Sequence, residues 1–529
     1  MKTCSRCQLE FEISPEDAQF LTKFEVPEPK LCPDCRNMRR LGFRNDRNFY
    51  KRNCDACKKL IVSICSPDKP FPVYCKECYL SDQYDPLAYG VDYDFSRPFF
   101  EQFAEMRAKV PRVANYFTQC ENCDYTVHTG NSRNCYMGNS FVNSENTYYS
   151  DWAFYSKDCS DLYMCQTMER CYECFQCEQC YSSMWLENCM SVNFSAFCFD
   201  CRSSQNLIGC VGQRQKTLMI LNRAVTQEEF DTTWKKLMTD DAFRADFVKQ
   251  YQALRLTIPV KSTWDKNSEN CSGNYVTNSR NASQSYSVKD VEDGSHLYEV
   301  GGLKDGMDVT RCARGEFVYE VTALIDLKFS KFCNLCYQSS NMEYCDNCQS
   351  SHNSFGCMGL KGHRYCILNK QYSPEDYAVM VDKIRTAMRA SGEYGEFFPA
   401  SLSVYGYNET KACDFYPLSK EEALAEGLKW REPDPMPTGA HGEKDVMGCE
   451  QCGKNYRLIA QELALYTMLG VPLPTRCFNC RQRARMALET PRHLWDRACA
   501  KCQMPIQTTY AADRPEVVCC EKCYLNALV

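Results

Sequence analysis

Histidine is scarce in this sequence, with six residues in a chain of 529. None of them lies in an H-x-E or H-E-x-x-H motif, and no G-x-x-x-x-G-K-[ST] phosphate-binding loop occurs. We therefore expect each histidine to be a surface or turn residue, and the protein not to be an enzyme. The six are His128, His296, His352, His363, His441 and His493.

The sequence also lacks long apolar runs and an export signal. No stretch of about 18 apolar residues could span a membrane, and Met1-Lys2-Thr3-Cys4 does not begin a signal peptide. The net charge of −6 is too small to indicate a partner. These features predict a cytoplasmic protein. In that compartment, repeated C-x2-C pairs are far more often metal ligands than disulfides.

Cysteine, by contrast, is abundant, with forty residues. Sixteen of them form C-x2-C pairs near the two ends, grouped in fours, and each C-terminal member lies 445 residues after an N-terminal counterpart. Tetrahedral Zn²⁺ takes four such thiolates, so we predict about four structural zinc ions in tandem zinc-ribbon pairs at 1–82 and 445–529. The predicted ligands are Cys4, Cys7, Cys32, Cys35, Cys54, Cys57, Cys75, Cys78, Cys449, Cys452, Cys477, Cys480, Cys499, Cys502, Cys520 and Cys523.

The region between the ribbons is a tandem duplication. Asn131-Ser132-Arg133-Asn134 recurs as Asn278-Ser279-Arg280-Asn281, and Ile220-Leu221-Asn222 recurs as Ile367-Leu368-Asn369, both at an offset of 147 residues. Inside the first copy, cysteines recur in steps of 12 and then 9 residues, turn residues are abundant, and no helical apolar stripe occurs. The pattern predicts a mainly β fold, a duplicated short-coil parallel β-solenoid whose narrow interior holds cysteine.

Helices are expected to close each solenoid copy. Thr226-x2-Glu229 and Ser373-Pro374-Glu375-Asp376 have the composition of helix starts, and apolar residues follow each at helical spacing. Such caps cover a strand edge that would otherwise be open. The predicted segments are 83–119 (connection with a short helix), 120–255 and 256–400 (solenoid copies with capping helices) and 401–444 (linker, flexible over 432–444).

Arginines follow the second C-x2-C pair at both ends of the chain. One interpretation is a treble-clef helix whose arginines contact phosphate or another partner. The alternative is a solvated helix face, or pairing with acids of the same chain such as Glu10, Glu12, Glu16 and Asp17. Both interpretations stay open. The candidate contact residues are Arg36, Arg39, Arg40, Arg44, Arg47, Arg481, Arg483 and Arg485.

The central cysteines allow two kinds of metal site. Cys171-x2-Cys174-x2-Cys177-x2-Cys180 resembles the C-x2-C-x2-C run of iron–sulfur proteins, but the second copy has hydrophobic residues at these positions. A set shared by both copies could bind a further metal or form a buried ladder of thiols, and we favour the ladder. The shared set is Cys189, Cys198, Cys201 and Cys210 in the first copy and Cys336, Cys345, Cys348 and Cys357 in the second.

Several motifs together resemble a family of cysteine-rich, multi-zinc-ribbon proteins from small-genome uncultured bacteria. They are Cys32-Pro33-Asp34-Cys35-Arg36, Lys51-Arg52-Asn53-Cys54, Ser66-Pro67-Asp68-Lys69-Pro70, the run from Asp92 to Phe103, and Gly406-Tyr407-Asn408-Glu409-Thr410. The resemblance covers most of the chain. It implies a multi-ribbon architecture and a bacterial cytosolic setting, but no reaction.

Two functions of different classes are compatible with these features. The first is a non-enzymatic zinc-binding scaffold or adaptor whose ribbons dock on RNA, DNA or a protein complex. The second is an iron–sulfur or thiol-based redox or metal-handling protein that uses the run from Cys171 to Cys180. No membrane partner and no small-molecule substrate is indicated.

Overall fold

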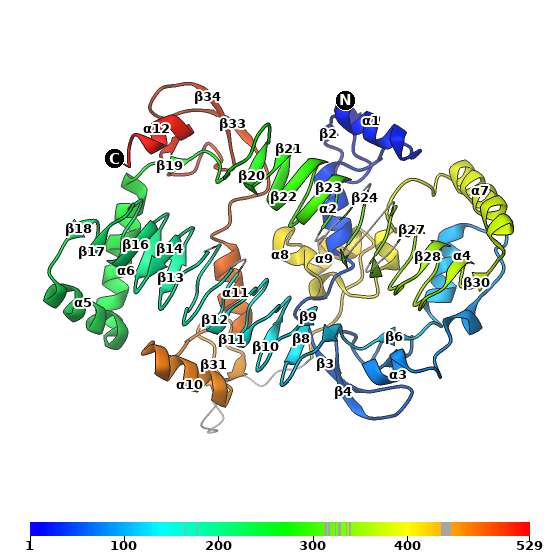
Figure 1. Cartoon of the computed structure of the whole chain (residues 1–529), viewed down its shortest axis with the longest axis horizontal. Coiled ribbons are helices and arrows are strands. Elements are labelled where there is room, and N and C mark those ends of the chain that lie inside the picture. Colours follow the sequence, from blue (N-terminus) through cyan, green and yellow to red (C-terminus); the bar gives the residue numbers. More distant parts are fainter. Residues whose placement is uncertain are drawn as a thin grey trace. The chain divides into compact units, whose positions relative to one another are not determined.

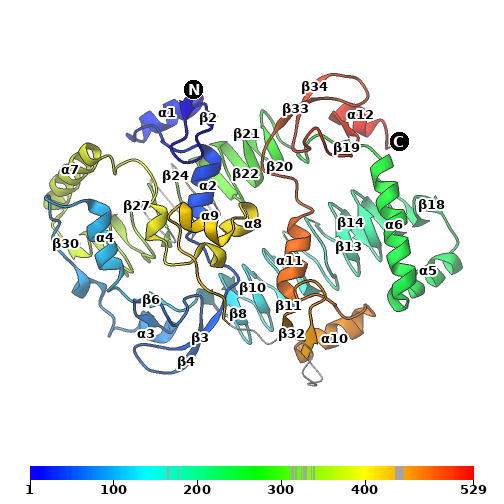
Figure 2. The same cartoon turned by 180° about the vertical axis from the view of Figure 1, so that it is seen from behind.

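The computed structural model describes residues 1–528 except 164–165, 177, 311–314, 316–317, 323, 326–329, 335, 338–339 and 435–445. The chain forms two compact units, each combining one end of the sequence with one central copy. Unit 1 consists of Met1–Ala114 and Thr263–Glu432, and unit 2 of Asn115–Ser262 and Pro433–Val529. Strands are many and short, and most sheets are small and parallel. Figure 1 labels the elements, and Figure 2 shows them from behind.

Short parallel strands stack in unit 2 at a constant register of twelve residues. Tyr136 pairs with Asp124 on one side and with Tyr148 on the other. We call this stack the first ladder. Its strands are β7 (Phe117–Thr118), β8 (Asp124–Val127), β9 (Thr129–Gly130), β10 (Tyr136–Asn139), β11 (Glu145–Tyr148), β12 (Lys157–Ser160), β13 (Met184–Glu187), β14 (Met190–Asn193), β15 (Ala196–Phe199), β16 (Arg202–Ile208) and β17 (Thr217–Ile220).

Unit 1 contains the equivalent second ladder with the same register, for example Gly273 with Ser285 and His352 with Arg364. The matching pairs in the two units confirm that the 147-residue duplication is structural. Its strands are β20 (Gly273–Thr277), β21 (Arg280–Ser283), β22 (Ser285–Ser295), β23 (Gly301–Met307), β24 (Val318–Tyr319), β25 (Leu324–Ile325), β26 (Cys336–Tyr337), β27 (Ser340–Glu343), β28 (His352–Phe355) and β29 (Arg364–Ile367).

A period of three residues underlies the twelve-residue register. Asn131, Asn134 and Met137 all have positive φ, at 49°, 53° and 46°, and the residues after the first two, Ser132 and Cys135, are buried. The same three-residue pattern continues through most of the described part of both ladders. Asn, Asp and Gly tolerate left-handed backbone best, which explains why turn residues are so abundant here. One register step therefore contains four three-residue segments.

The inward side chains donate hydrogen bonds to backbone carbonyls in two neighbouring register steps. The Cys171 thiol lies 3.3 Å from the carbonyl oxygen of Glu169 and 3.5 Å from that of Cys180. The Ser144 hydroxyl makes the same pair of bonds, two residues back at 3.2 Å and nine residues ahead at 2.9 Å. Cysteines nine residues apart therefore lie in adjacent register steps. The nine-residue spacing does not indicate a second coil length.

Helices follow the last strand of each ladder, as predicted. The Thr226 hydroxyl accepts a hydrogen bond from the Glu229 amide at 3.2 Å, and Ser373 does the same for Asp376 at 3.1 Å. A short antiparallel strand precedes each helix and pairs with the final parallel strand. These elements are β18 (Arg223–Ala224), α5 (Gln227–Thr239) and α6 (Asp241–Thr257) in unit 2, and β30 (Lys370–Gln371) and α7 (Pro374–Ser391) in unit 1.

The two ends of the chain fold into hairpins and short helices. In unit 1 these are β1 (Lys2–Thr3), β2 (Glu10–Phe11), α1 (Pro15–Lys23), α2 (Pro33–Leu41), β3 (Tyr50–Asn53), β4 (Leu60–Ser63), β5 (Val73–Tyr74), α3 (Lys76–Leu80), η1 (Pro86–Tyr89), α4 (Phe99–Arg107) and β6 (Arg112–Val113). In unit 2 they are β31 (Val446–Gly448), β32 (Asn455–Arg457), α10 (Ala460–Leu469), α11 (Phe478–Met486), β33 (Trp495–Ala498), β34 (Pro505–Thr508), β35 (Val518–Cys519) and α12 (Glu521–Leu525), together with β19 (Val260–Lys261), which pairs with β35.

Each end packs on a ladder through residues at equivalent positions. The Asn347 amide donates to the Tyr79 hydroxyl at 2.9 Å in unit 1, and the Tyr524 hydroxyl bonds Asp200 in unit 2. These tyrosines are 445 residues apart and their partners 147, so the two units are structural repeats. The N-terminal end therefore belongs with the second ladder, and the C-terminal end with the first. Both views show α11 beside the strands of the first ladder (Figures 1 and 2).

The short helix expected in the connecting segment is α4. Phe99 and Phe103 are fully buried, and Phe99 packs against Tyr344 and Phe355 of the second ladder, with ring centroids 5.2 and 5.4 Å apart. The apolar side of this helix is therefore a packing face, as predicted.

Part of the predicted linker is folded. Residues 400–425 contain η2 (Ala400–Leu402), η3 (Tyr407–Glu409), α8 (Ala412–Phe415) and α9 (Lys420–Ala425). Tyr407, Ala412 and Ala423 form a buried cluster with Met38 and Leu41 of α2. Burial of these side chains orders a stretch whose composition is loop-like. Of the flexible stretch predicted at 432–444, residues 435–444 lie outside the described residues.

Candidate metal centres

Each of the four C-x2-C hairpins has the same backbone geometry. In the first, the Gln8 amide donates to the Cys4 carbonyl at 3.0 Å, and the Cys4 amide donates to the Leu9 carbonyl at 2.9 Å. The turn needs a left-handed residue after its second cysteine. Gln8, Lys58, Gly453 and Gln503 occupy this position, with φ between 61° and 71°. The hairpin presents two sulfurs on one side of the turn.

The second cysteine pair of each group lies at the start of a helix. Cys32, Cys75, Cys477 and Cys520 are the N-cap residues of α2, α3, α11 and α12. The fourth cysteine follows three positions later, in the first helical turn. A helix N-terminus favours thiolate because its unpaired N–H groups point outward.

Hairpin and helix bring the four sulfurs of each group together. In all four groups the sulfurs lie within 4.8 Å of one another. The Cys7–Cys32, Cys57–Cys75, Cys452–Cys477 and Cys502–Cys520 sulfur pairs are each 3.8 Å apart. Four thiolates around a tetrahedral ion at about 2.3 Å would have sulfurs about 3.8 Å apart. The sixteen cysteines therefore form four groups that could hold metal ions, which matches the predicted number of sites.

The backbone also favours thiolate at the first cysteine of each group. Burial disfavours the charged form of Cys4, but amide groups including that of Cys32, 3.3 Å from the sulfur, lower its pKa to about 6. The same balance lowers the pKa of Cys54 to about 7, of Cys449 to about 6 and of Cys499 to about 5. A thiolate is the form that binds a metal.

Most of the arginines beside the metal groups form ion pairs with carboxylates of the same unit. Arg36 and Arg40 are 1% and 0% exposed and share one carboxylate. Asp308 Oδ2 lies 2.5 Å from Arg36 Nε, and Oδ1 lies 3.4 Å from Arg40 Nη2. Asp161 Oδ2 lies 2.9 Å from Arg481 Nε, and Oδ1 2.9 Å from Arg485 Nη2. In both units, therefore, Nε of the first arginine meets Oδ2 of the aspartate and Nη2 of the second arginine meets Oδ1.

The other candidate arginines vary in exposure. Arg39 binds Glu320 at 2.7 Å and Glu396 at 2.9 Å, buried Arg44 binds Asp46 at 3.0 Å, and Arg47 pairs with Asp414. Arg483 is exposed. Pairing with acids of the same chain was one of the two interpretations, but the acids differ from those expected. Asp308, Glu320 and Asp161 lie in the ladders. Glu396 and Asp414 follow the second ladder, and Asp46 lies two residues from Arg44.

The ladder cysteines act as hydrogen-bond donors. The Cys189 thiol lies 3.4 Å from the Glu187 and Cys198 carbonyls, and the Cys201 thiol 3.4 Å from the Cys210 carbonyl. Burial raises the pKa of Cys201 and of Cys345 well above the ordinary range. In the described parts of the ladders, no three thiol, imidazole or carboxylate groups lie close enough to share an ion. Cys177 and the Cys336 side chain lie outside the described residues.

His296 lies at a turn of the second ladder, one of the two places expected for the histidines, but it is buried. His296 is 5% exposed, and its Nε2 lies 3.1 Å from Asp17 Oδ2. Burial disfavours the Asp17 carboxylate, but the hydrogen bond and charge of His296 outweigh it and lower the Asp17 pKa to about 2. Asp17 is not a partner of the candidate arginines. Instead it joins α1 to the second ladder, because Ser295 also donates to it.

Sequence reasoning missed the acidic residues that hold the ends on the ladders. Asp161 and Asp308 are 147 residues apart, and Arg36 and Arg481 are 445 apart. An acid kept at the same left-handed position of both copies is a signal that comparison of the two repeats could have found. The partner of each, however, lies beyond the reach of local spacing.

In the part of the chain that the structure describes, no helix is both long and apolar enough to cross a membrane. Comparisons with protein-family models, with curated proteins and with solved structures find no match. The four Cys4 groups are the findings that accord with the resemblance to cysteine-rich, multi-zinc-ribbon proteins.

Proposed function

We propose that this protein is a non-enzymatic zinc-binding scaffold. The ladders are the coils of a duplicated β-solenoid, and the hairpin-and-helix modules are treble-clef zinc ribbons. The observation that carries the proposal is the fourfold recurrence of sulfurs 3.8 Å apart, the separation that tetrahedral Zn²⁺ requires. Each ion cross-links a hairpin to a helix start within a small module.

The bound metal supports the packing of the ends on the ladders. Cys35 and Arg36 are adjacent on α2, so fixing one end of the helix at the metal also fixes the guanidinium that meets Asp308. The same holds for Cys480 and Arg481 on α11. Structural zinc sites contribute directly to folding free energy, so zinc would hold each end in its docked position.

We favour a protein complex as the docking partner in the cytoplasm. Most of the arginines that could have bound phosphate are paired with carboxylates, and the net charge is −6. Steep weakening of RNA or DNA binding between low and moderate salt would instead support the nucleic-acid version. The iron–sulfur alternative gains no support from thiols that donate to carbonyls.

Elemental analysis of protein purified without oxygen tests the metal proposal. We expect four zinc ions per chain and no iron, matching the four groups. Cys57→Ser should lower the zinc count by one, whereas Cys189→Ser should leave it unchanged because Cys189 faces a carbonyl. Iron in place of zinc, or equal zinc loss in both variants, would refute the assignment.

A further inference from the structure

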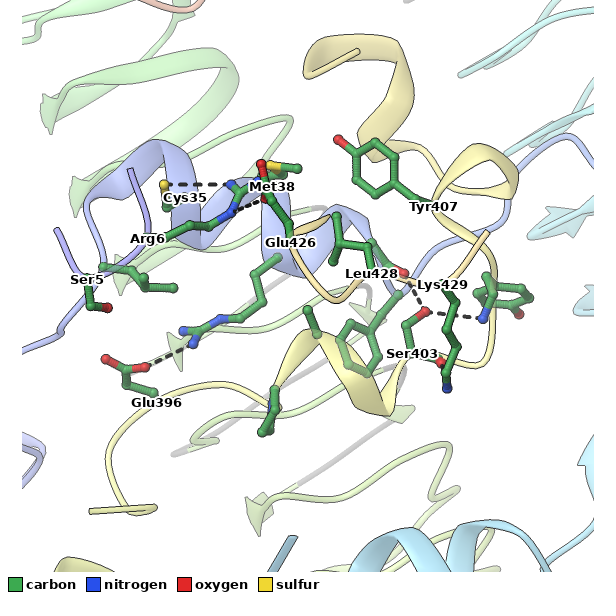
Figure 3. Close-up of a pocket in the computed structure, with 17 residues that line it drawn as sticks. Ser5, Arg6, Cys35, Met38, Glu396, Ser403, Tyr407, Glu426, Leu428 and Lys429 are labelled. Atoms are coloured by element: carbon green, nitrogen blue, oxygen red, sulfur yellow. Dashed lines mark hydrogen bonds and ion pairs between the residues drawn. The ribbon is translucent and has the colours of Figure 1, made fainter. Parts of the chain in front are cut away.

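Unit 1 contains a pocket of about 500 Å³ beside its first cysteine group. Sites for small molecules typically measure roughly 300–1,000 Å³. Its walls come from the first hairpin, from α2 and from the segment around η2 and α9, as Figure 3 shows for Arg6, Met38 and Ser403. No part of the proposed scaffold role requires a cavity here.

The pocket lining combines apolar side chains with two arginine–glutamate pairs, Arg6–Glu426 and Arg39–Glu396, and one lysine. Leu31, Met38, Phe43 and Leu428 supply the apolar surface. Arg39 also lines the pocket; its side chain is only 10% exposed. Its two terminal nitrogens hold Glu320 and Glu396, while its buried Nε has no hydrogen-bond partner.

A second cation at the pocket lacks a carboxylate. Lys429 Nζ donates to the Ser403 carbonyl at 2.7 Å, and it forms no ion pair with any carboxylate in the described part of the chain. Arg107 and Arg112, which influence Lys429 electrostatically but do not line the pocket, share the single carboxylate of Asp346, at 2.9 and 3.1 Å. Burial and these neighbouring cations lower the pKa of Lys429. This end of the pocket therefore has an excess of positive charge.

The structural repeat shows that the architecture does not require these residues. The cysteines and the buried arginines of α2 recur in α11, but Arg6, Met38 and Arg39 correspond to Gln451, Arg483 and Ala484, at the same offset of 445. The pocket residues thus differ where the structural residues repeat.

We propose that this pocket binds a small organic monoanion. Its carboxylate accepts from Lys429 at the mouth, and its apolar body lies against Met38, Phe43 and Leu428. The site belongs to unit 1 alone. It would make the scaffold responsive to a small carboxylic acid, a property that goes beyond zinc-dependent docking.

Calorimetric titration of the zinc-loaded full chain with 3-phenylpropionate tests the proposal, with neutral 3-phenylpropionamide as the matched probe. We expect saturable binding of the acid and at least about tenfold weaker binding of the amide, since a charge-assisted hydrogen bond is lost. Lys429→Met should weaken acid binding by about the same factor. Lys383→Met, which changes an exposed lysine on α7, should leave it unchanged.

A second variant separates loss of the site from loss of the fold. Ala400→Trp places a bulky side chain at a half-buried position of the pocket lining, outside the buried cluster of Met38, Leu41 and Tyr407. It should abolish binding while zinc content and the thermal unfolding midpoint stay unchanged. The proposal fails if the acid does not bind at millimolar concentration, if acid and amide bind equally, or if Lys429→Met and Ala400→Trp bind as wild type. The zinc count is independent of these results, so the two proposals can fail separately.

Discussion

At the scale of single residues, a carboxylate between two guanidinium groups holds each end of the chain on a ladder. Asp308 and Asp161 are both fully buried, so no water compensates the charges when one partner is lost. Burying charged groups is expensive, and a buried ion pair adds stability only when its geometry is complete. The arrangement therefore specifies where the ends dock more than it adds to overall stability.

Asp308→Asn should be strongly destabilising, by about 3–5 kcal/mol, because it leaves Arg36 and Arg40 without their shared counter-ion. Thermal unfolding of unit 1 reports the change, and Asp290→Asn, at an exposed corner of the same ladder, serves as the control. Equal midpoints for the two variants would show that the buried pair is dispensable.

The inward cysteines are a second residue-scale feature. Serine, threonine and cysteine occupy equivalent corners, and each donates to carbonyls two residues back and nine ahead. Side-chain size and a donor group are therefore what the interior requires, and cysteine supplies both. This explains why the ladder is rich in cysteine although no three metal-binding groups of its described residues converge.

Cys189→Ser should change the free energy of unfolding by less than about 1 kcal/mol, since a hydroxyl can donate to the same two carbonyls. Cys189→Ala removes the donor and should cost about 1–3 kcal/mol. Chemical denaturation of unit 2, followed by a tryptophan of that unit such as Trp185, measures both. A serine variant as unstable as the alanine variant would indicate that the sulfur has another role.

At the scale of the element, the left-handed residue after the first C-x2-C pair of each group shapes the metal site. Three of the four positions hold Gln or Lys, and the fourth holds Gly453 with φ of 71°. A β-branched residue there costs roughly 1–2 kcal/mol, while glycine relieves strain.

Gly453→Val should weaken zinc binding by the group that contains Cys449 about tenfold. Lys58→Gly should leave the zinc affinity of the group that contains Cys54 unchanged or slightly higher. Competition with a chromophoric chelator gives both affinities. The interpretation fails if the valine variant retains zinc as wild type does.

The first thiolates also predict how metal binding depends on pH. Protons compete with the metal, so a group with a lower thiol pKa retains zinc to lower pH. Cys54, at about 7, should lose its ion before Cys499, at about 5, as the solution is acidified. When zinc release is measured against pH, Cys57→Ser should lack the release at higher pH and Cys502→Ser the release at lower pH. Loss of the lower-pH release in Cys57→Ser would contradict the expectation.

At the scale of the whole molecule, neighbours in sequence are not neighbours in the fold. The N-terminal modules pack on the second ladder and the C-terminal modules on the first, so the chain passes from one unit to the other three times. Each unit therefore depends on segments hundreds of residues apart, as Arg481 and Asp161 illustrate.

Truncation after residue 432 should consequently destabilise the first ladder and spare the second. Hydrogen exchange should rise over 115–262 because Asp161 loses both of its arginines, while 263–432 keeps its protection. If the second ladder, which precedes the cut directly in sequence, lost protection instead, the assignment of ends to ladders would be wrong.

The sequence by itself determined the local features of this protein. Metal ligands need fixed spacing over a few residues, so the sixteen cysteines could be grouped before their sulfurs were seen within 4.8 Å. The 147-residue repeat and the helix starts at Thr226 and Ser373 are local patterns as well. The three-residue period was also present in the sequence, but cysteines in steps of 12 and 9 concealed it.

Only the tertiary structure decided which end packs on which ladder, and therefore which arginines are buried in ion pairs. Arg36 and Arg483 look alike in sequence, yet one is buried against Asp308 and the other is exposed. The difference depends on a carboxylate 272 residues away. Helix spacing specifies ligands on one short segment, whereas burial and charge pairing depend on the packing of distant ones. The folding of residues 400–425 on α2 was decided in the same way.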